Sequence, residues 1–198
     1  MSSLLDKSLL NQEHESPGET RFRMLYVLRE FGLEQLDAEG EGTATREAHA
    51  AYYLRLSEEA NSQLHGCEQK GWRNQLEHEH DNLRAALNWW LEQANAPEAA
   101  ERALRLWWAL AQSRFKQPCY REGYTNVKRI LAVRAGVAEA MQVKALLYAA
   151  AVLRSVDEVE QAEPLIQEAL ALARQMGDLP GIAFAVQNLG GVAVDQDR

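Results

Sequence analysis

The sequence predicts an all-α protein, a solenoid of helical hairpins preceded by a short β-hairpin. Residues that favour helices, chiefly Ala, Leu, Glu, Gln and Arg, dominate the chain after Thr43. Segments of the C-terminal half recur at an offset of about 39 to 40 residues, which is typical of helical repeats. The beginning of the chain instead alternates between apolar and polar residues. With 198 residues, 46% of them apolar, the chain is long enough to bury a core.

The first 25 residues predict the β-hairpin. Apolar and polar side chains alternate in Ser8–Asn11 and in Thr20–Leu25, and a turn-forming Pro17–Gly18 pair stands between them. The apolar spacing then becomes helical, which predicts a short helix over 26–36. The acidic, glycine-containing segment 37–44 ends this pattern and predicts an exposed linker.

The remainder, 45–198, predicts a continuous series of helices. Asp81 stands just before one apolar helical pattern, where a carboxylate can accept the unpaired amides of a first turn, so we expect Asp81 to be its N-cap. We expect helices near 45–65, 71–78, 81–94, 98–115, 119–134, 139–154, 158–176 and 180–195.

The repeat predicts how these helices pack. At an offset of about 40 residues, Ala150-Ala151-Val152 aligns with Gly190-Gly191-Val192, so small residues recur where paired helices must approach closely. Each pair leaves one apolar face for the next pair to cover. In this register the chain ends within an unfinished pair. We therefore expect the apolar face of 180–195 to associate with a second copy, giving a homo-oligomer, or with additional chain.

Composition excludes several classes of protein. No apolar run approaches the roughly 20 residues that a membrane span requires, and the N-terminus lacks a signal-peptide core, so we expect a cytoplasmic protein without membrane partners. Cys67 and Cys119 are too few and too far apart for a disulfide framework or a paired metal site. Both are expected to be unpaired thiols.

Several segments together point to a known family. They are Leu5–Leu10, Arg21–Leu25, Val27–Leu36, His49–Leu54, Trp72 with Leu76-Glu77, and Glu79–Leu87. They resemble the region after the nucleotide-binding module in bacterial signal-transduction ATPases with numerous domains, which include LuxR-type and maltose-regulator-like transcriptional regulators. Asp81–Leu87 is the most specific match. Glu168–Asp178 is similar to the end-of-helix signature of the family's tetratricopeptide-like repeats.

The resemblance implies a regulatory module. Residues 1–36 would be the remnant of a winged-helix element, and 45–198 would be tetratricopeptide-like repeats that sense a protein partner, another domain or a small inducer. The phosphate-binding motif GxxxxGK[ST] and a recognisable helix-turn-helix are missing from the sequence. We therefore expect no ATP hydrolysis, no cofactor and no specific DNA binding by this chain. A P-loop upstream in the parent protein would make the chain the regulatory part of an NTPase.

The stretch 102–134 is the candidate binding region. It carries eight basic side chains against one acidic side chain, with aromatic residues interleaved. Such a surface can bind a phosphorylated ligand, an acidic peptide or single-stranded nucleic acid, and a nucleic-acid-binding module is the alternative function. In the competing interpretation the aromatic side chains fill the core, and the basic side chains balance the negative charge of the first half of the chain. The candidate groove residues are Trp107, Trp108, Arg114, Tyr120, Arg121, Tyr124, Lys128 and Arg129.

Other motifs favour structural roles. His78 and His80 would point to opposite sides of a helix and could not share a metal ion, so we expect a solvated helix junction at Glu77–Asp81. The glycine pairs at 40–42 and 190–191 lack the strand that precedes a phosphate-binding loop. We find no activated serine or cysteine nucleophile, which predicts a non-catalytic chain.

Overall fold

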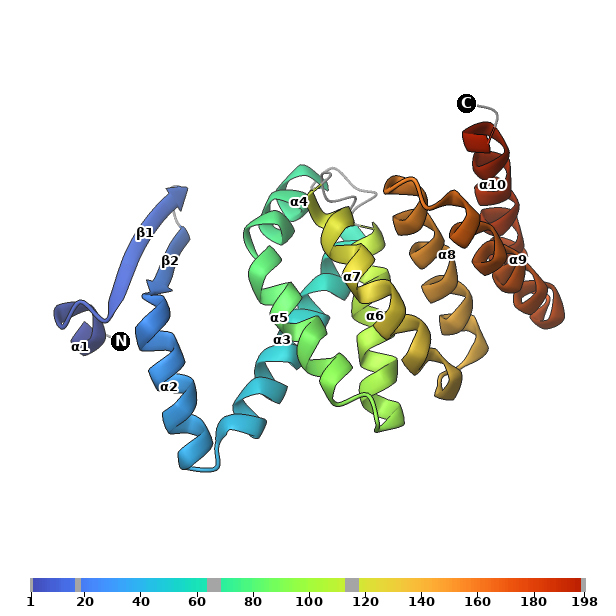
Figure 1. Cartoon of the computed structure of the whole chain (residues 1–198). Coiled ribbons are helices and arrows are strands. Elements are labelled where there is room, and N and C mark those ends of the chain that lie inside the picture. The colour runs from blue at the N-terminus through green and yellow to red at the C-terminus, as the bar shows by residue number, and fades with distance from the viewer. Residues whose placement is uncertain (1, 17–18, 64–68, 113–117, 197–198) are drawn as a thin grey trace. The chain divides into compact units, whose positions relative to one another are not determined.

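The computed structural model describes residues 2–16, 19–63, 69–112 and 118–196 (Figure 1). The chain forms two compact units, Met1–Ala48 and His49–Arg198. Most described residues are helical, and one small antiparallel sheet lies in the first unit. The all-α class with a short N-terminal hairpin, as predicted from the sequence, is confirmed at this level.

The first unit begins with the hairpin. Its elements are α1 (Ser2–Asp6), β1 (Leu10–Ser16), β2 (Glu19–Met24), α2 (Tyr26–Ala38) and the first turns of α3 (Gly42–Gln63). The strands pair in register from Leu10 opposite Met24 to Ser16 opposite Glu19, with an irregularity between His14 and Ser16. The short helix α1 was not predicted, because five residues give too little periodicity to recognise.

The connection between α2 and α3 is shorter than the linker expected over 37–44. Only residues 39–41 lie outside the helices, and Gly40 has a left-handed φ of 77° there. Arg46 donates two hydrogen bonds to the carboxylate of Asp37, at 2.6 and 2.7 Å. A Cβ atom on Gly42 would clash with that carboxylate. The turn is therefore tight because one ion pair and two glycines close it.

The second unit contains the rest of α3 and the helices that follow. They are α4 (Gln69–His78), α5 (His80–Glu92), α6 (Pro97–Gln112), α7 (Pro118–Val133), the short 3-10 helix η1 (Arg134–Gly136), α8 (Glu139–Ser155), α9 (Val159–Met176) and α10 (Leu179–Gln196). Pro97 and Pro118 each occupy a first helical position, where the missing N–H has no intrahelical partner to lose.

Helix α8 is at the centre of the packing in the second unit. It contacts α6, α7, α9 and α10, so α6, α8 and α10 follow one another as neighbours (Figure 1). Gly123 on α7 allows a close approach to α8, because a Cβ there would lie 3.2 Å from both γ carbons of Val152. The largest side chains of the core, all nearly inaccessible to solvent, include Leu76, Leu83, Leu104, Leu106, Trp107, Ile130, Leu146, Leu147 and Ile166.

Arginine–carboxylate pairs connect helices that are distant in sequence. Arg105 on α6 pairs with Glu58 on α3 at 2.7 Å, and Arg134 in η1 pairs with Glu168 on α9 at 2.6 Å. A third pair, Arg154 with Asp195, joins α8 to α10 at 2.7 Å. The helices are thus fixed to one another by polar contacts at their surfaces as well as by the apolar core.

No helix in the described part of the chain is both long enough and apolar enough to cross a bilayer.

Candidate functional site

The two adjacent tryptophans of the predicted groove have different surroundings. Trp107 is only 2% exposed, and the centre of its ring lies 4.5 Å from the centre of the Tyr148 ring on α8. Trp108 is half-buried and turns toward other helices. Trp107 therefore belongs to the core, whereas Trp108 reaches the surface.

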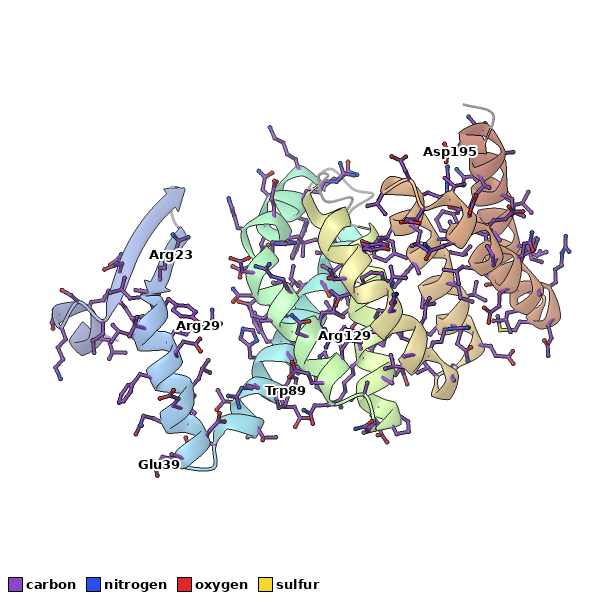
Figure 2. The ribbon with its side chains drawn as sticks, in the orientation of Figure 1. Arg23, Arg29, Glu39, Trp89, Arg129 and Asp195 are labelled. Carbon is purple, nitrogen blue, oxygen red and sulfur yellow. The ribbon has the colours of Figure 1, made fainter. Side chains whose placement is uncertain are left out.

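The groove residues on α7 are likewise divided. Tyr124 and Lys128 are exposed, but Arg129, which Figure 2 labels, donates hydrogen bonds to Oδ1 of Asn88 on α5 at 2.7 Å and to Oδ1 of Asn126 at 3.2 Å. Arg129 thus links α7 to α5. Of the remaining candidates, Arg114 lies outside the described residues, and the side chains of Tyr120 and Arg121 are not described.

Most of the described cations in 102–134 contact other parts of the chain. Besides the pairs of Arg105, Arg129 and Arg134, the guanidinium carbon of Arg102 lies 4.8 Å from the centre of the Trp90 ring. Lys128 is the exception among the described basic side chains of this stretch. These side chains are therefore largely occupied in holding helices together.

Trp108 instead meets side chains from two later helices. The Lys144 ammonium on α8 lies 5.8 Å from the centre of the Trp108 ring, and the Phe184 ring on α10 lies 6.2 Å away at 84°. We call these three residues the 108–144–184 cluster. Both contacts have the preferred geometry of their kind: a cation near an aromatic ring and an edge-to-face ring pair. Three successive neighbouring helices thus contribute one side chain each to a single surface.

The cluster combines exposed apolar area with one positive charge. Phe184 is 40% exposed and Lys144 is exposed, and among the described residues Lys144 has no ion pair. The sequence from 179 to 194 on α10 carries no charged side chain. Exposed Gln187 lies on the next turn of α10 after Phe184 and offers an amide group. The surface can therefore hold a group that is apolar and negatively charged.

The sequence interpretation missed Lys144 and Phe184 because it considered only the basic stretch 102–134. A signal for them exists in the repeat. At the offset that aligns Ala145 with Ala185, Lys144 aligns with Phe184, so both occupy the same position in successive units. Matched positions on successive helices lie on one face of a repeat array.

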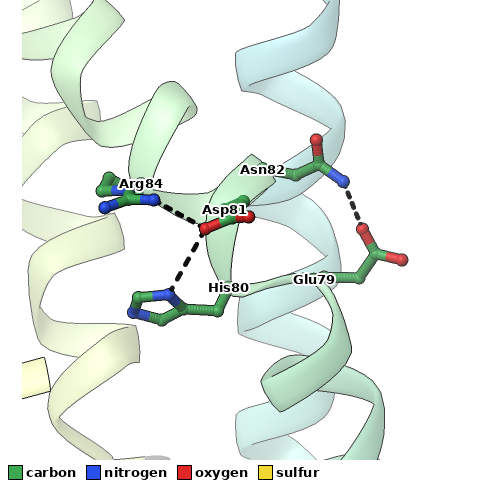
Figure 3. A network of polar contacts seen from close by, with 5 residues as sticks. All are labelled: Glu79, His80, Asp81, Asn82 and Arg84. Carbon is green, nitrogen blue, oxygen red and sulfur yellow. Dashed lines mark hydrogen bonds and ion pairs between the residues drawn. The ribbon is translucent and has the colours of Figure 1, made fainter. Parts of the chain in front are cut away.

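The motif around Asp81 forms a polar network (Figure 3). The Glu79 carboxylate accepts a hydrogen bond from Asn82 Nδ2 at 2.5 Å and another from the hydroxyl of Tyr53 on α3 at 3.0 Å. Glu79 thus joins the α4–α5 junction to α3. This contact gives the network a structural role.

Asp81 itself is not the N-cap that the sequence predicts. Helix α5 begins one residue earlier, at His80, and the residue before it, Glu79, makes no side-chain capping bond. Asp81 therefore lies within the first turn, where its carboxylate accepts a hydrogen bond from Arg84 Nη2 at 2.6 Å and lies 3.9 Å from His80 Nδ1 (Figure 3). No group of three metal-binding side chains occurs in the described ranges of the chain.

Fold and surface together define a predominantly helical protein with an exposed aromatic and cationic patch. The chain is similar to proteins named "Putative HTH-type transcriptional regulator" from Mycobacterium bovis and from two strains of Mycobacterium tuberculosis. Identity to each is 32% over 199 aligned residues, which cover 96% of this chain and 22% of the relative. The chain therefore spans about a fifth of the length of these relatives. No family model and no solved structure matches it significantly.

Proposed function

We propose that the chain is a non-catalytic recognition module of a bacterial transcriptional regulator. In this proposal residues 45–198 form a tetratricopeptide-like solenoid, and its α6–α8–α10 face binds a protein partner, another domain of the longer protein or a small inducer. The longer protein would be a cytoplasmic, ATP-dependent regulator of the LuxR-type kind, with its nucleotide-binding module outside this chain. The similarity to the mycobacterial regulators supports the regulatory part of the proposal.

The observation that carries the proposal is the 108–144–184 cluster. Aromatic side chains that reach the surface are typical of surfaces that recognise partners, because they bury large apolar area on binding. The Lys144 ammonium adds a positive charge beside them. Here each of three neighbouring helices supplies one member. The succession of α6, α8 and α10 also supports a repeat array, because each helix packs on the one before it.

The cluster also suggests how binding would be transmitted. Trp108 and Phe184 come from helices on either side of α8 and touch each other across it. An occupant that separates the two rings would favour a more open arrangement of the three helices. Binding would then shift the equilibrium between two states of the regulator. The size of the shift would depend on the difference between the occupant's affinities for the two states.

Regulation of transcription is tested by deleting the gene that encodes this chain in its host. We expect a defined set of transcripts to change and the wild-type gene to restore them. A gene carrying Phe184→Ala should fail to restore them, and one carrying Tyr124→Ala, an exposed aromatic on α7, should succeed. Unchanged transcripts after deletion would contradict the regulatory role. Full restoration by Phe184→Ala would contradict the role of the cluster.

Nucleic-acid binding is less well supported by the same surfaces. Four of the five described cations in 102–134 contact other parts of the chain, and the net charge of −8 opposes a polyanion. Phosphate backbones require several available cations, whereas the cluster offers one.

A further inference from the structure

We propose that the 108–144–184 cluster binds an extended peptide segment in which an apolar residue and an acidic residue are separated by one position. The carboxylate pairs with the Lys144 ammonium, and the apolar side chain packs on the rings of Trp108 and Phe184. This inference rests on the proposed function and names its ligand class.

The charge of the site selects an anion. The Lys144 ammonium lies 5.8 Å from the centre of the Trp108 ring, and within the described part of the chain no carboxylate neutralises it. The exposed ammonium is thus accessible beside the apolar surface of that ring. A ligand carboxylate gains a charge-assisted hydrogen bond there.

The spacing of the cluster fits an extended chain. Alternate side chains of an extended peptide point to the same side and are about 6.8 Å apart. Lys144 and Phe184 lie 5.8 and 6.2 Å from the centre of the Trp108 ring. An apolar residue and an acidic residue separated by one position therefore present both groups to the cluster at once.

The openness of the surface favours a peptide over a small acid. Sites for small molecules are concave and enclose most of the ligand. Phe184 is instead 40% exposed, and Lys144 and Gln187 are also exposed. The Gln187 amide can both donate to and accept from a peptide backbone, which adds a contact that a simple carboxylic acid lacks.

The experiment titrates the 198-residue protein with a short acetylated peptide that contains Phe-Ala-Glu, and calorimetry records binding. We expect saturable one-to-one binding, and a matched peptide with Phe-Ala-Gln should bind about tenfold more weakly because it lacks the charge. Phenylacetate and a short oligothymidylate serve as a small acid and a nucleic acid.

Variants then locate the binding. Lys144→Gln should weaken binding of the Phe-Ala-Glu peptide about tenfold and remove its preference over the Phe-Ala-Gln peptide. Phe184→Ala should weaken both peptides alike. Lys128→Gln, the same change at an exposed lysine on α7, should have no effect. Circular dichroism of each variant controls for folding, and Lys144→Arg should retain the preference for the acid.

Several results would overturn the proposal. They are no binding of the acidic peptide, equal binding of both peptides, unchanged affinity in Lys144→Gln, or tighter binding of phenylacetate or oligothymidylate than of the peptide. Failure here is distinguishable from failure of the proposed function. If Phe184→Ala still abolishes transcript control in the host, the surface recognises a different class of ligand. If deletion of the gene changes no transcript, the regulatory role is itself wrong.

Discussion

Neighbouring residues of one helix differ in role here because they face different helices. Successive residues point about 100° apart around a helix, so Trp107 and Trp108 cannot both face the core. Trp107 packs on Tyr148, and Trp108 reaches toward α8 and α10 at the surface. One residue stabilises the core of the unit, and the other reaches its surface.

Replacing each tryptophan by alanine separates these roles. Trp107→Ala should lower the free energy of unfolding by about 3 to 5 kcal/mol, because it empties a site in a close-packed core. Trp108→Ala should cost only about 1 kcal/mol, since its ring is half-buried. Chemical denaturation followed by circular dichroism measures both. Equal losses would show that the two rings are buried alike.

The ion pair at the α2–α3 turn predicts a local pH dependence. Hydrogen bonds from Arg46 lower the pKa of the Asp37 carboxyl below its ordinary value of 3.8. A lowered pKa in the folded state means that this stabilisation is complete above the ordinary value and disappears as pH falls through the folded value. At neutral pH Asp37→Asn should therefore weaken the turn, and at low pH the two proteins should become equivalent.

Carboxyl NMR titration measures this effect directly. In the wild type, Asp37 should titrate below its ordinary pKa, and in Arg46→Gln its pKa should return toward that value. Glu39, which lies in the same turn, provides an internal reference for changes in the turn as a whole. A pKa of Asp37 that is unaffected by Arg46→Gln would show that the ion pair does not persist in solution.

At the scale of elements, ion pairs between helices set how successive helices dock. Nε and Nη2 of Arg154 on α8 donate to one oxygen of Asp195 on α10, which Figure 2 labels, at 2.9 and 2.7 Å. The guanidinium lies over Gly191, where a Cβ atom would clash with it. The pair is about three-quarters buried on each side. It fastens the end of α10 to α8.

Arg154→Ala should therefore loosen α10 without unfolding the unit. Loss of a partly buried, doubly hydrogen-bonded pair costs about 1 kcal/mol, which corresponds to a roughly fivefold increase in local opening. Hydrogen–deuterium exchange should be faster in α10 and unchanged in α5. Arg174→Ala, at an exposed arginine on α9, serves as the matched control. Equal exchange in the wild type and Arg154→Ala would show that apolar packing alone holds α10.

Most elements could be predicted from the sequence because local signals agree. Apolar periodicity and prolines placed the helices from 45 onward within a few residues of their observed ends, and alternation with Pro17–Gly18 placed the hairpin. Less was predictable where a single contact decides the structure. The ion pair of Asp37 shortens the 37–44 segment, and the earlier start of α5 moves Asp81 out of its capping position.

The candidate site was only partly predictable, and the reason is long-range packing. Charge and aromatic content identified the region of Trp108, but they do not show which arginines form contacts with other helices. Arg129 binds Asn88 on α5, and Arg105 binds Glu58 on α3. Lys144 and Phe184 become part of the site only when three helices are brought together. The sequence carries one signal that relates them, since Lys144 aligns with Phe184 at the 40-residue offset.

At the scale of the whole molecule, α10 presents an apolar stripe to solvent. Leu179, Val186 and Val194 are all more than half exposed on a helix whose residues 179–194 carry no charge. Apolar residues at this spacing lie near one face of a helix and are typical of a helix that packs on another. The prediction that this end of the chain associates with a second copy or with additional chain therefore concerns this face of α10.

Self-association through α10 is measured by sedimentation velocity over a range of protein concentrations. We expect the 198-residue chain to form dimers at high concentration and Val186→Glu to remain a monomer, because burying an unpaired carboxylate opposes association. Ala171→Glu, at an exposed position on α9, should dimerise like the wild type. A wild-type chain that stays monomeric at all concentrations would contradict self-association through this face.

The proposed recognition face of α6, α8 and α10 depends most directly on the contact between Trp108 and Phe184. Proton NMR of the aromatic side chains tests it, with Trp108→Phe and Phe184→Leu to assign the signals. We expect a nuclear Overhauser effect between the two rings, whose centres lie 6.2 Å apart edge to face. Signals joining Trp108 to Tyr124 on α7, with none to Phe184, would instead place Trp108 in the basic groove and contradict the account.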